Sequence, residues 1–155
     1  MIINIKNTPS AQNPQDLVLD QLDAKLLEQQ GAGSNSHLSL DGDADFTNLD
    51  LTDVQAVTIQ FPAFTDGRGF SLAMKIRQSG FTGTLCAKGP LIPDQAVHLM
   101  RCGFDHIDLD RHERLDAFYR SLKRYSHFYQ GGRPSPTGEA KSILELRHRG
   151  QKAAS

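Results

Sequence analysis

Two short segments concentrate the side chains that could do chemistry. The first carries Asp66 and Arg68, and the second supplies Lys88, Asp94 and Gln95. An arginine guanidinium presents a planar fork that fits an oxyanion or a carboxylate, whereas a lysine offers a point charge. A carboxylate beside them could serve as a general acid or base. These residue types therefore suit either the binding of a small oxyanion or of a partner's carboxylates, or acid–base catalysis.

The first segment is rich in glycine. Residues 61–70 read Phe-Pro-Ala-Phe-Thr-Asp-Gly-Arg-Gly-Phe, so that Gly67 and Gly69 flank Arg68. Glycine permits tight turns and close backbone approach, and a loop between a strand and a helix is where α/β folds usually place a site. The segment lacks the third small residue of a Gly-x-Gly-x-x-Gly fingerprint and lies several residues past the strand. It therefore does not predict nicotinamide or flavin binding.

The same residues also have a purely structural interpretation. Asp66 and Asp94 each precede a predicted helix, and an aspartate side chain at that place accepts N–H groups of the first helical turn. Arg68 would then form a salt bridge with one of the two carboxylates. The sequence leaves this interpretation open beside catalysis and anion binding.

The two cysteines are predicted to be reduced and packed. Cys102 follows Arg101, and an adjacent cation can lower the pKa of a thiol. Neighbouring helical side chains point apart, however, and no histidine is expected in position to act as a base. A packed thiol is therefore favoured and a reactive thiol is the alternative. Cys86 is predicted to be a core residue of a short strand.

No metal or cofactor is predicted. The cysteines form no Cys-x-x-Cys pair. The six histidines show no ligand spacing on a single helix, and two cysteines do not make a haem or iron–sulfur site. The aspartate-rich stretch 41–53 lacks the downstream Gly and Glu of a calcium-binding EF-hand loop, so we expect a solvated loop with one helical turn.

Strands that alternate with helices are predicted to position the candidate residues. Strands are expected over 2–6, 36–40, 55–61, 84–87 and 104–109, and helices over 14–30, 70–79, 93–102 and 115–129, with a capping box at 110–113. This alternation indicates βαβ crossovers and a parallel sheet. We therefore expect a small α/β domain over residues 1–130, built on a parallel sheet of about four strands with flanking helices.

The predicted topology gathers the candidate residues at one edge of the sheet. Loops that leave the carboxyl ends of parallel strands lie side by side, and three such loops are expected over 62–69, 88–93 and 109–112. They would bring the two segments together, with His112 as a further candidate. Helix N-termini near residues 70 and 93 would favour an anion there.

Composition is typical of a globular protein. The chain has 155 residues, of which 23% are charged and 38% apolar, and neither a membrane-spanning run nor a signal peptide is predicted. We therefore expect a cytoplasmic protein. Residues 1–60 carry nine acids against two lysines, a balance that suits a protein partner or a small anion better than nucleic acid. Residues 131–155 are predicted to be a linker and a basic, flexible tail.

Four sequence blocks resemble the bacterial domain of unknown function 934. They are Phe61-Pro-Ala-Phe-Thr-Asp-Gly-Arg-Gly-Phe-Ser71, Gly80-Phe-Thr-Gly-Thr-Leu85, Asp94-Gln95 and Arg101-Cys-Gly-Phe-Asp105. The resemblance is strongest over 55–129. Members of that family are described as probable oxidoreductases linked to sulfite reduction and tend to be encoded beside assimilatory sulfite reductase. The matching blocks single out Asp66, Gly67, Arg68, Gly69, Asp94, Gln95, Arg101 and Cys102. One departure is the proline at 93, directly before Asp94, which is expected to shift the start of that helix.

The resemblance and the lack of a cofactor motif together imply an accessory protein of assimilatory sulfite reduction, without a cofactor of its own. It would contact sulfite reductase or bind a small oxyanion at the loop rim. The predicted ligand- or partner-binding residues are Asp66, Gly67, Arg68, Gly69, Lys88, Asp94, Gln95 and Arg101. The alternative is a stand-alone small enzyme with Asp66 or Asp94 as acid or base, Arg68 as anion clamp and Cys102 as a further catalytic candidate. A flavin or nicotinamide oxidoreductase is the third hypothesis, and no nucleic-acid or membrane partner is predicted.

Overall fold

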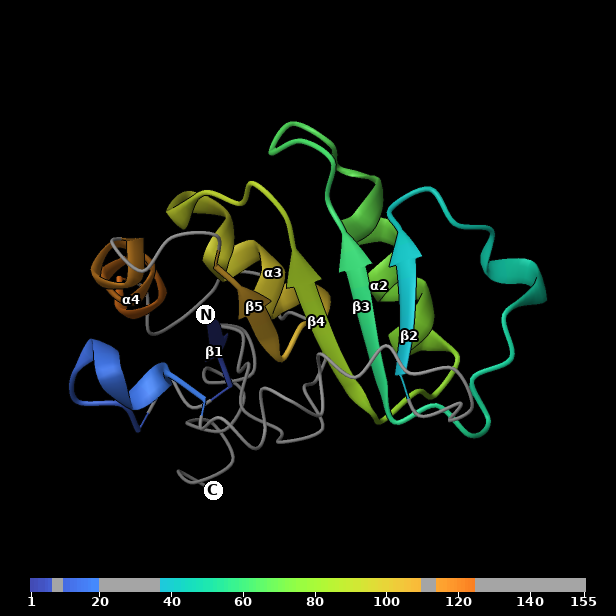
Figure 1. Ribbon diagram of the computed structural model, residues 1–155, viewed down its shortest axis with the longest axis horizontal. Helices are drawn as coiled ribbons and strands as arrows, with labels where there is room; N and C mark the ends of the chain where they lie inside the picture. The colour runs from blue at the N-terminus through green and yellow to red at the C-terminus, as the bar shows by residue number, and fades with distance from the viewer. Residues whose placement is uncertain (7–9, 20–36, 110–113, 125–155) are drawn as a thin grey trace, which may run out of the picture.

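The described part of the chain forms an α/β domain on a five-stranded sheet. The computed structural model describes residues 1–6, 10–19, 37–109 and 114–124. The strands are β1 (Ile2–Asn4), β2 (His37–Asp41), β3 (Ala56–Gln60), β4 (Thr84–Lys88) and β5 (His106–Asp108). Their order is β1-β5-β4-β3-β2, with β2 to β5 parallel and β1 antiparallel to β5 (Figure 1). The predicted α/β class is confirmed, and β1 makes the mostly parallel sheet a mixed one.

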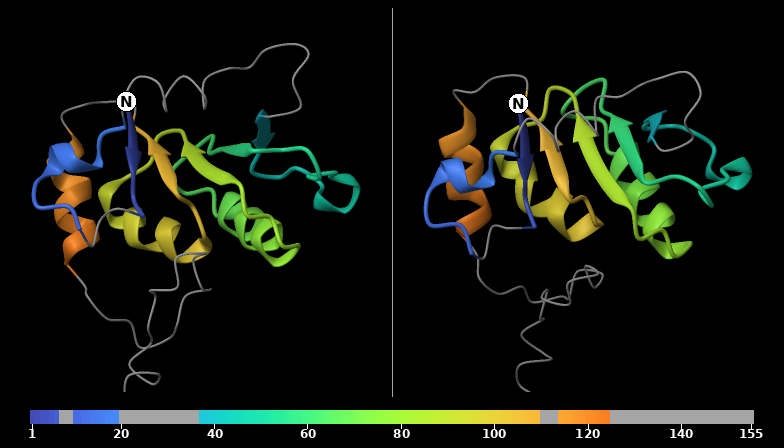
Figure 2. Two further views of the ribbon diagram at one scale, coloured as in Figure 1. Left: turned by 90° about the horizontal axis from the view of Figure 1, so that it is seen from below. Right: turned by 60° about the horizontal axis from the view of Figure 1, so that its bottom comes forward.

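Three helices flank the sheet in the described residues. They are α2 (Arg68–Gln78), α3 (Ala96–Cys102) and α4 (Leu115–Lys123). Helices α2 and α3 cover the same face of the sheet, and α4 lies beside α3 and the 3-10 turn Pro14–Leu17 near the β1 edge (Figure 2). None of the helices in the described ranges is long and apolar enough to cross a membrane.

The helix boundaries differ from the sequence predictions at two loops. Helix α2 begins at Arg68 rather than at Phe70. The helix predicted from Pro93 begins as the 3-10 turn Pro93–Gln95 and becomes α-helical only at Ala96. Gly103, with φ +99°, ends α3 as predicted. The predicted single turn in the acidic stretch is the 3-10 turn Phe46–Asn48.

The helix predicted to run on from Pro14 is interrupted. Asn13 caps one 3-10 turn, after which Val18 adopts an extended backbone and bridges Ile3. The N–H of Leu19 donates to the Ile2 carbonyl at 3.1 Å. The chain therefore pairs here with the edge of β1 that faces away from β5, although the spacing of its apolar residues predicts a helix. The remainder of that predicted helix lies outside the described residues, as do the capping box at 110–113, His112 and the tail 131–155.

Strand alternation divides the sheet into an apolar and a polar face. Residues in register point to the same face of neighbouring strands. The face toward α2 and α3 carries Val57, Ile59, Leu85, Ala87 and Ile107, which belong to the hydrophobic core. The opposite face carries Ser39, Thr58, Cys86, His106 and, at the carboxyl ends, Asp41, Gln60, Lys88 and Asp108. The core therefore lies between the sheet and the helices.

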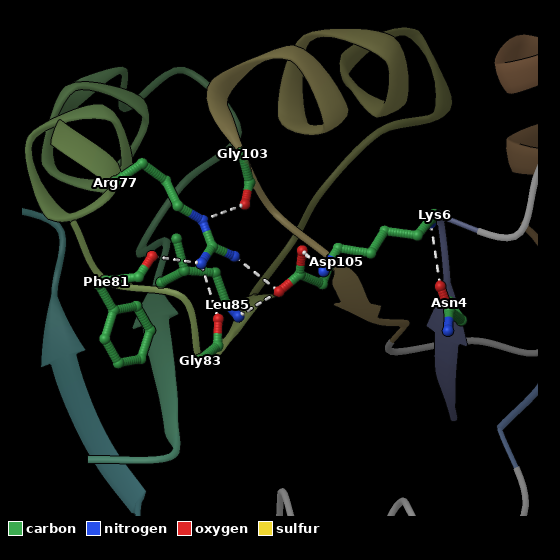
Figure 3. A network of polar contacts seen from close by, with 8 residues as sticks. All are labelled: Asn4, Lys6, Arg77, Phe81, Gly83, Leu85, Gly103 and Asp105. Atoms are coloured by element: carbon green, nitrogen blue, oxygen red, sulfur yellow. Dashed lines mark hydrogen bonds and ion pairs between the residues drawn. The ribbon is translucent and has the colours of Figure 1, made fainter. Parts of the chain in front are cut away.

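A buried ion pair closes the edge of the sheet at which β4 and β5 begin. Nη2 of Arg77 lies 2.6 Å from Oδ2 of Asp105, and their side chains are 8% and 3% exposed. The same Oδ2 accepts the Leu85 N–H at 2.8 Å, and Oδ1 pairs with Nζ of Lys6 at 2.7 Å. Arg77 also donates to the carbonyls of Phe81, Gly83 and Gly103 (Figure 3). This network joins α2, two turns and the segment after β1.

Candidate functional site

The candidate residues lie mainly at the carboxyl ends of the parallel strands. There the segment between β3 and α2 projects beyond the sheet (Figure 1). The last residues of β2, β3, β4 and β5 are in register and form a row across this edge, Asp41, Gln60, Lys88 and Asp108. We call this edge, with segments 41–45, 61–68 and 89–95, the loop rim.

Arg68 is engaged by two carboxylates. Its Nη2 lies 2.6 Å from Oδ2 of Asp66, and its Nε donates to Oδ1 of Asp66 at 3.0 Å. Its Nη1 lies 2.9 Å from Oδ2 of Asp43, in the loop after β2. The structural interpretation left open by the sequence, a salt bridge to Asp66, is therefore present. Asp43 was not expected as a partner, because it lies 25 positions upstream.

Asp66 supports the start of α2 without occupying its N-cap position. Gly67 holds that position and has no side chain to cap with. Oδ1 of Asp66 nevertheless accepts the N–H of Arg68 at 3.0 Å. The side-chain hydrogen bonds from Arg68, followed by that backbone bond, lower the pKa of Asp66 to about 2. In turn the carboxylates raise the pKa of Arg68. The pair is thus fully charged at neutral pH.

The lowered pKa of Asp66 predicts a measurable titration. Because the folded-state pKa lies below the ordinary value of 3.8, the pair's contribution to stability is present above that value and is lost as the pH falls toward 2. In a carboxyl-carbon NMR titration, Asp66 should show a midpoint near pH 2. Arg68→Ala should raise this midpoint toward the ordinary value. A wild-type midpoint near 4 would contradict the geometry.

The two glycines of the first segment have different roles. A Cβ at Gly69 would lie 2.6 Å from the Phe61 ring, whereas a Cβ at Gly67 would meet nothing within 4 Å. Gly42, in the loop after β2, also packs directly on the Gly69 backbone, since its own Cβ would lie 3.1 Å from the Gly69 nitrogen. Gly69 is therefore required for close packing around the buried Phe61.

Gln95 joins the two predicted loops. Its Nε2 donates to the Phe64 carbonyl at 2.7 Å, and its Oε1 accepts the Ile92 N–H at 3.1 Å. The prediction that segments 62–69 and 88–93 meet is thus confirmed. The prediction that Asp94 caps the helix is wrong, since Ile92 occupies that position and the exposed Asp94 lies inside the 3-10 turn.

Lys88 has its own carboxylate partner. Its Nζ lies 3.4 Å from Oδ2 of Asp108, its in-register neighbour on β5, and the side chain is about half exposed. The loop that follows is also anchored, because Nη1 of Arg114 donates to the Leu91 carbonyl at 3.0 Å. The two cations expected to bind an anion, Arg68 and Lys88, are therefore each paired with aspartate in the described residues.

Arg101 and Cys102 lie away from the loop rim. They occupy the last turn of α3, whose first turn is the one near the rim. The expectation that no histidine is placed near Cys102 is wrong, because His98 lies four positions earlier and its Nε2 is 3.8 Å from the thiol. Such a separation puts two side chains on one face of a helix. The His98 ring also packs on Phe70 at 4.5 Å between centroids.

This contact does not activate the thiol. Burial raises the pKa of Cys102 to about 11, despite the opposing charge of Arg101. Burial likewise lowers the pKa of His98, so both groups are neutral at pH 7. Cys86, in the middle of β4, has its pKa raised by burial to about 12. The packed state predicted for both thiols agrees with their burial.

The raised pKa values predict slow thiol chemistry. At pH 8 both cysteines of the folded protein should react with a disulfide reagent at least ~50-fold more slowly than an unhindered cysteine, because the thiolate is scarce and shielded. In denaturant both should react at the ordinary rate. Stopped-flow absorbance measures each phase, and rapid labelling of Cys102 in the folded protein would show that His98 does act as its base.

The loop rim is strongly acidic. The rim carries Lys88 and Arg68, each paired with aspartate, against six aspartates, which are Asp41, Asp43, Asp45, Asp66, Asp94 and Asp108. Within the described ranges no three His, Cys, Asp or Glu side chains are grouped to hold a metal ion. A dense negative field favours a positively charged partner. The aspartate-rich stretch was recognised in the sequence, but it was not expected beside the two predicted loops.

Comparison with known proteins identifies one match. The sequence model of a family described as a bacterial protein of unknown function (DUF934) matches residues 37–138. The matched span includes strands β2 to β5, helices α2 to α4 and the whole of the loop rim. No curated protein and no solved structure matches the chain.

Proposed function

The chain belongs to the bacterial family DUF934, and from that membership we propose that it is an accessory protein of assimilatory sulfite reduction that acts by contacting the reductase. The link to sulfite reduction rests on the family resemblance of the motif blocks. The mode of action rests on the loop rim. The observation that supports partner contact most strongly is that the Arg68 guanidinium already binds Asp66 and Asp43.

The charges of the loop rim favour partner contact over anion binding. A free oxyanion at Arg68 would have to share the guanidinium with two carboxylates and would face the surrounding aspartates. Lys88, the other expected anion ligand, is paired with Asp108. A protein surface carrying lysine or arginine meets no such obstacle, because it complements the acidic rim. Partner contact is therefore the branch of the proposal that the geometry supports.

The same geometry weighs against the stand-alone enzyme. A general acid or base works best when its pKa lies near the working pH, and the pKa of Asp66 is held at about 2. Cys102 is buried, with a raised pKa. Asp94 is exposed on a turn. These properties suit surface recognition more than proton transfer.

Co-purification and genetics together test the proposal. The tagged full-length chain should retain sulfite reductase from its own bacterium at low ionic strength, where contacts between exposed charges are strongest. A deletion strain should grow poorly with sulfate or sulfite as the sulfur source and normally with cysteine. The matched control is a strain complemented with the wild-type chain. No retention of the reductase combined with normal growth of the deletion strain on sulfite would reject this function.

A further inference from the structure

We propose that Phe64 is an anchor that enters an apolar pocket of a partner protein whose pocket is bordered by lysine or arginine. The inference deepens the proposed function and rests on it for the partner's identity, the cognate sulfite reductase. It adds the contact surface and the chemistry of the surface that fits it.

The exposure of Phe64 is the first observation. Phe64 is 52% exposed, and Met74, at 36%, is the other large apolar residue exposed in the described part of the chain. Phe64 lies in the segment that projects beyond the carboxyl edge of the sheet between β3 and α2 (Figure 1), between the exposed Pro62 and Thr65. A ring in this position stabilises the isolated domain little, since about half of it stays in water.

The backbone that carries Phe64 is fixed, which distinguishes it from an incidental exposed residue. Its carbonyl accepts Nε2 of Gln95 at 2.7 Å, and the Asp66 N–H donates to the Ala63 carbonyl at 3.0 Å. The Arg68 ion pairs tie the end of the segment to the loop after β2. At its beginning, the Phe61 ring packs against Phe70 at 5.1 Å.

A rigid segment lowers the cost of binding. A partner need not order the backbone that presents the ring, so less conformational entropy is lost on association. Large aromatic side chains seated in pockets at the centre of an interface supply much of its binding energy. The segment therefore has the properties of a preorganised anchor.

The surrounding charge defines the partner. Asp43 and Asp66 lie at the base of the projecting segment, and Asp94 precedes Gln95, the residue that binds the Phe64 carbonyl. A complementary surface carries basic side chains around the pocket. A second copy of this chain docked through the same rim would place aspartates opposite aspartates, and such like-charge contacts are unfavourable.

Direct binding measurements test the inference. The full-length chain and three variants would be titrated calorimetrically into the purified cognate sulfite reductase holoenzyme. Phe64→Ala should weaken binding by about 30-fold, as expected for an interface anchor. Asp94→Asn should weaken it by about 3-fold through the lost charge alone. Met74→Ala, the matched control on α2, should bind like the wild type. Wild-type affinity should fall as salt is raised.

The outcomes separate the inference from the proposed function. Wild-type affinity for both Phe64→Ala and Met74→Ala overturns the anchor while leaving reductase contact intact. No binding by the wild-type chain overturns the proposed function and the inference with it. Binding whose affinity does not change with salt concentration overturns the claim that lysine or arginine borders the partner's pocket. If sedimentation shows that the wild type is a dimer and that Phe64→Ala is a monomer, the Phe64 surface binds a second copy of this chain. That result overturns the inference. Phe64→Ala should keep its Tm within about 3 °C of wild type.

Discussion

Replacing Asp105 with asparagine is expected to lower the free energy of unfolding by about 3–5 kcal/mol, the range for removing one partner of a buried ion pair. The substitution keeps the size of the side chain at position 105. It leaves the guanidinium of Arg77, whose side chain is 8% exposed, without its counter-charge. It also removes the carboxylate that binds Lys6 and the Leu85 N–H. Urea unfolding followed by circular dichroism measures the effect.

Two further variants make this result diagnostic. Asp43→Asn removes a carboxylate from an ion pair whose side chains are both more than half exposed, and should cost under about 0.5 kcal/mol. Lys6→Met removes only the Oδ1 contact of Asp105, and should give an intermediate loss of about 1–2 kcal/mol. If Asp105→Asn costs no more than Asp43→Asn, the buried network is not what holds this edge together.

The second large effect is expected for Gly89→Ala, which should destabilise the protein by about 3 kcal/mol or more. Gly89 has φ +136°, a conformation that side chains rarely adopt, and a Cβ there would lie 2.2 Å from the Phe61 carbonyl oxygen. That oxygen cannot move aside easily, because the N–H of Phe61 is bonded to the Lys88 carbonyl at 2.7 Å. The strain and the collision therefore add.

Gly80→Ala separates these two contributions. Gly80 has φ +93°, but a Cβ there would meet nothing within 4 Å. Its replacement should therefore cost only the conformational strain, about 1 kcal/mol. Both variants would be compared by urea unfolding with the fitted slope held in common. Equal losses at the two positions would show that the collision of the new Cβ with the Phe61 carbonyl adds nothing to the conformational strain.

The strands and helices could be predicted from the sequence, because the spacing of apolar residues that marks them involves only neighbouring positions. Alternating apolar runs and glycine stops located β3, α2, β4 and α3, and their order required a parallel sheet. The segment 61–68 was correctly placed at the carboxyl edge for the same reason. The contact between His98 and Cys102 could also have been predicted from the sequence. The two residues are four positions apart, and this spacing places them on one face of a helix.

The character of the loop rim could not be predicted in this way. The sequence left Arg68 open between anion binding and a salt bridge, because its second partner, Asp43, comes from a loop 25 positions away. The pairing of Arg77 with Asp105 spans 28 positions, and nothing local marks Arg77 as buried. Asp105 did fall within a family block, yet only the fold shows that it is structural. Whether a charged side chain is available to bind a ligand depends on ion-pair partners that are distant in the sequence. The spacing of apolar residues does not reveal these partners.

Strand β1 has a consequence for how the chain folds. Its residues Ile2–Asn4 pair with Asp108, Ile107 and His106, so the first strand finds its partner only after more than a hundred residues have been synthesised. Contacts of such sequence separation form slowly because a long loop must close first. Until β1 has paired with β5, the outer edge of β5 exposes unpaired N–H and C=O groups that can pair with strands of other chains. Loss of the first six residues, including Lys6, should therefore raise the tendency of the protein to aggregate during synthesis.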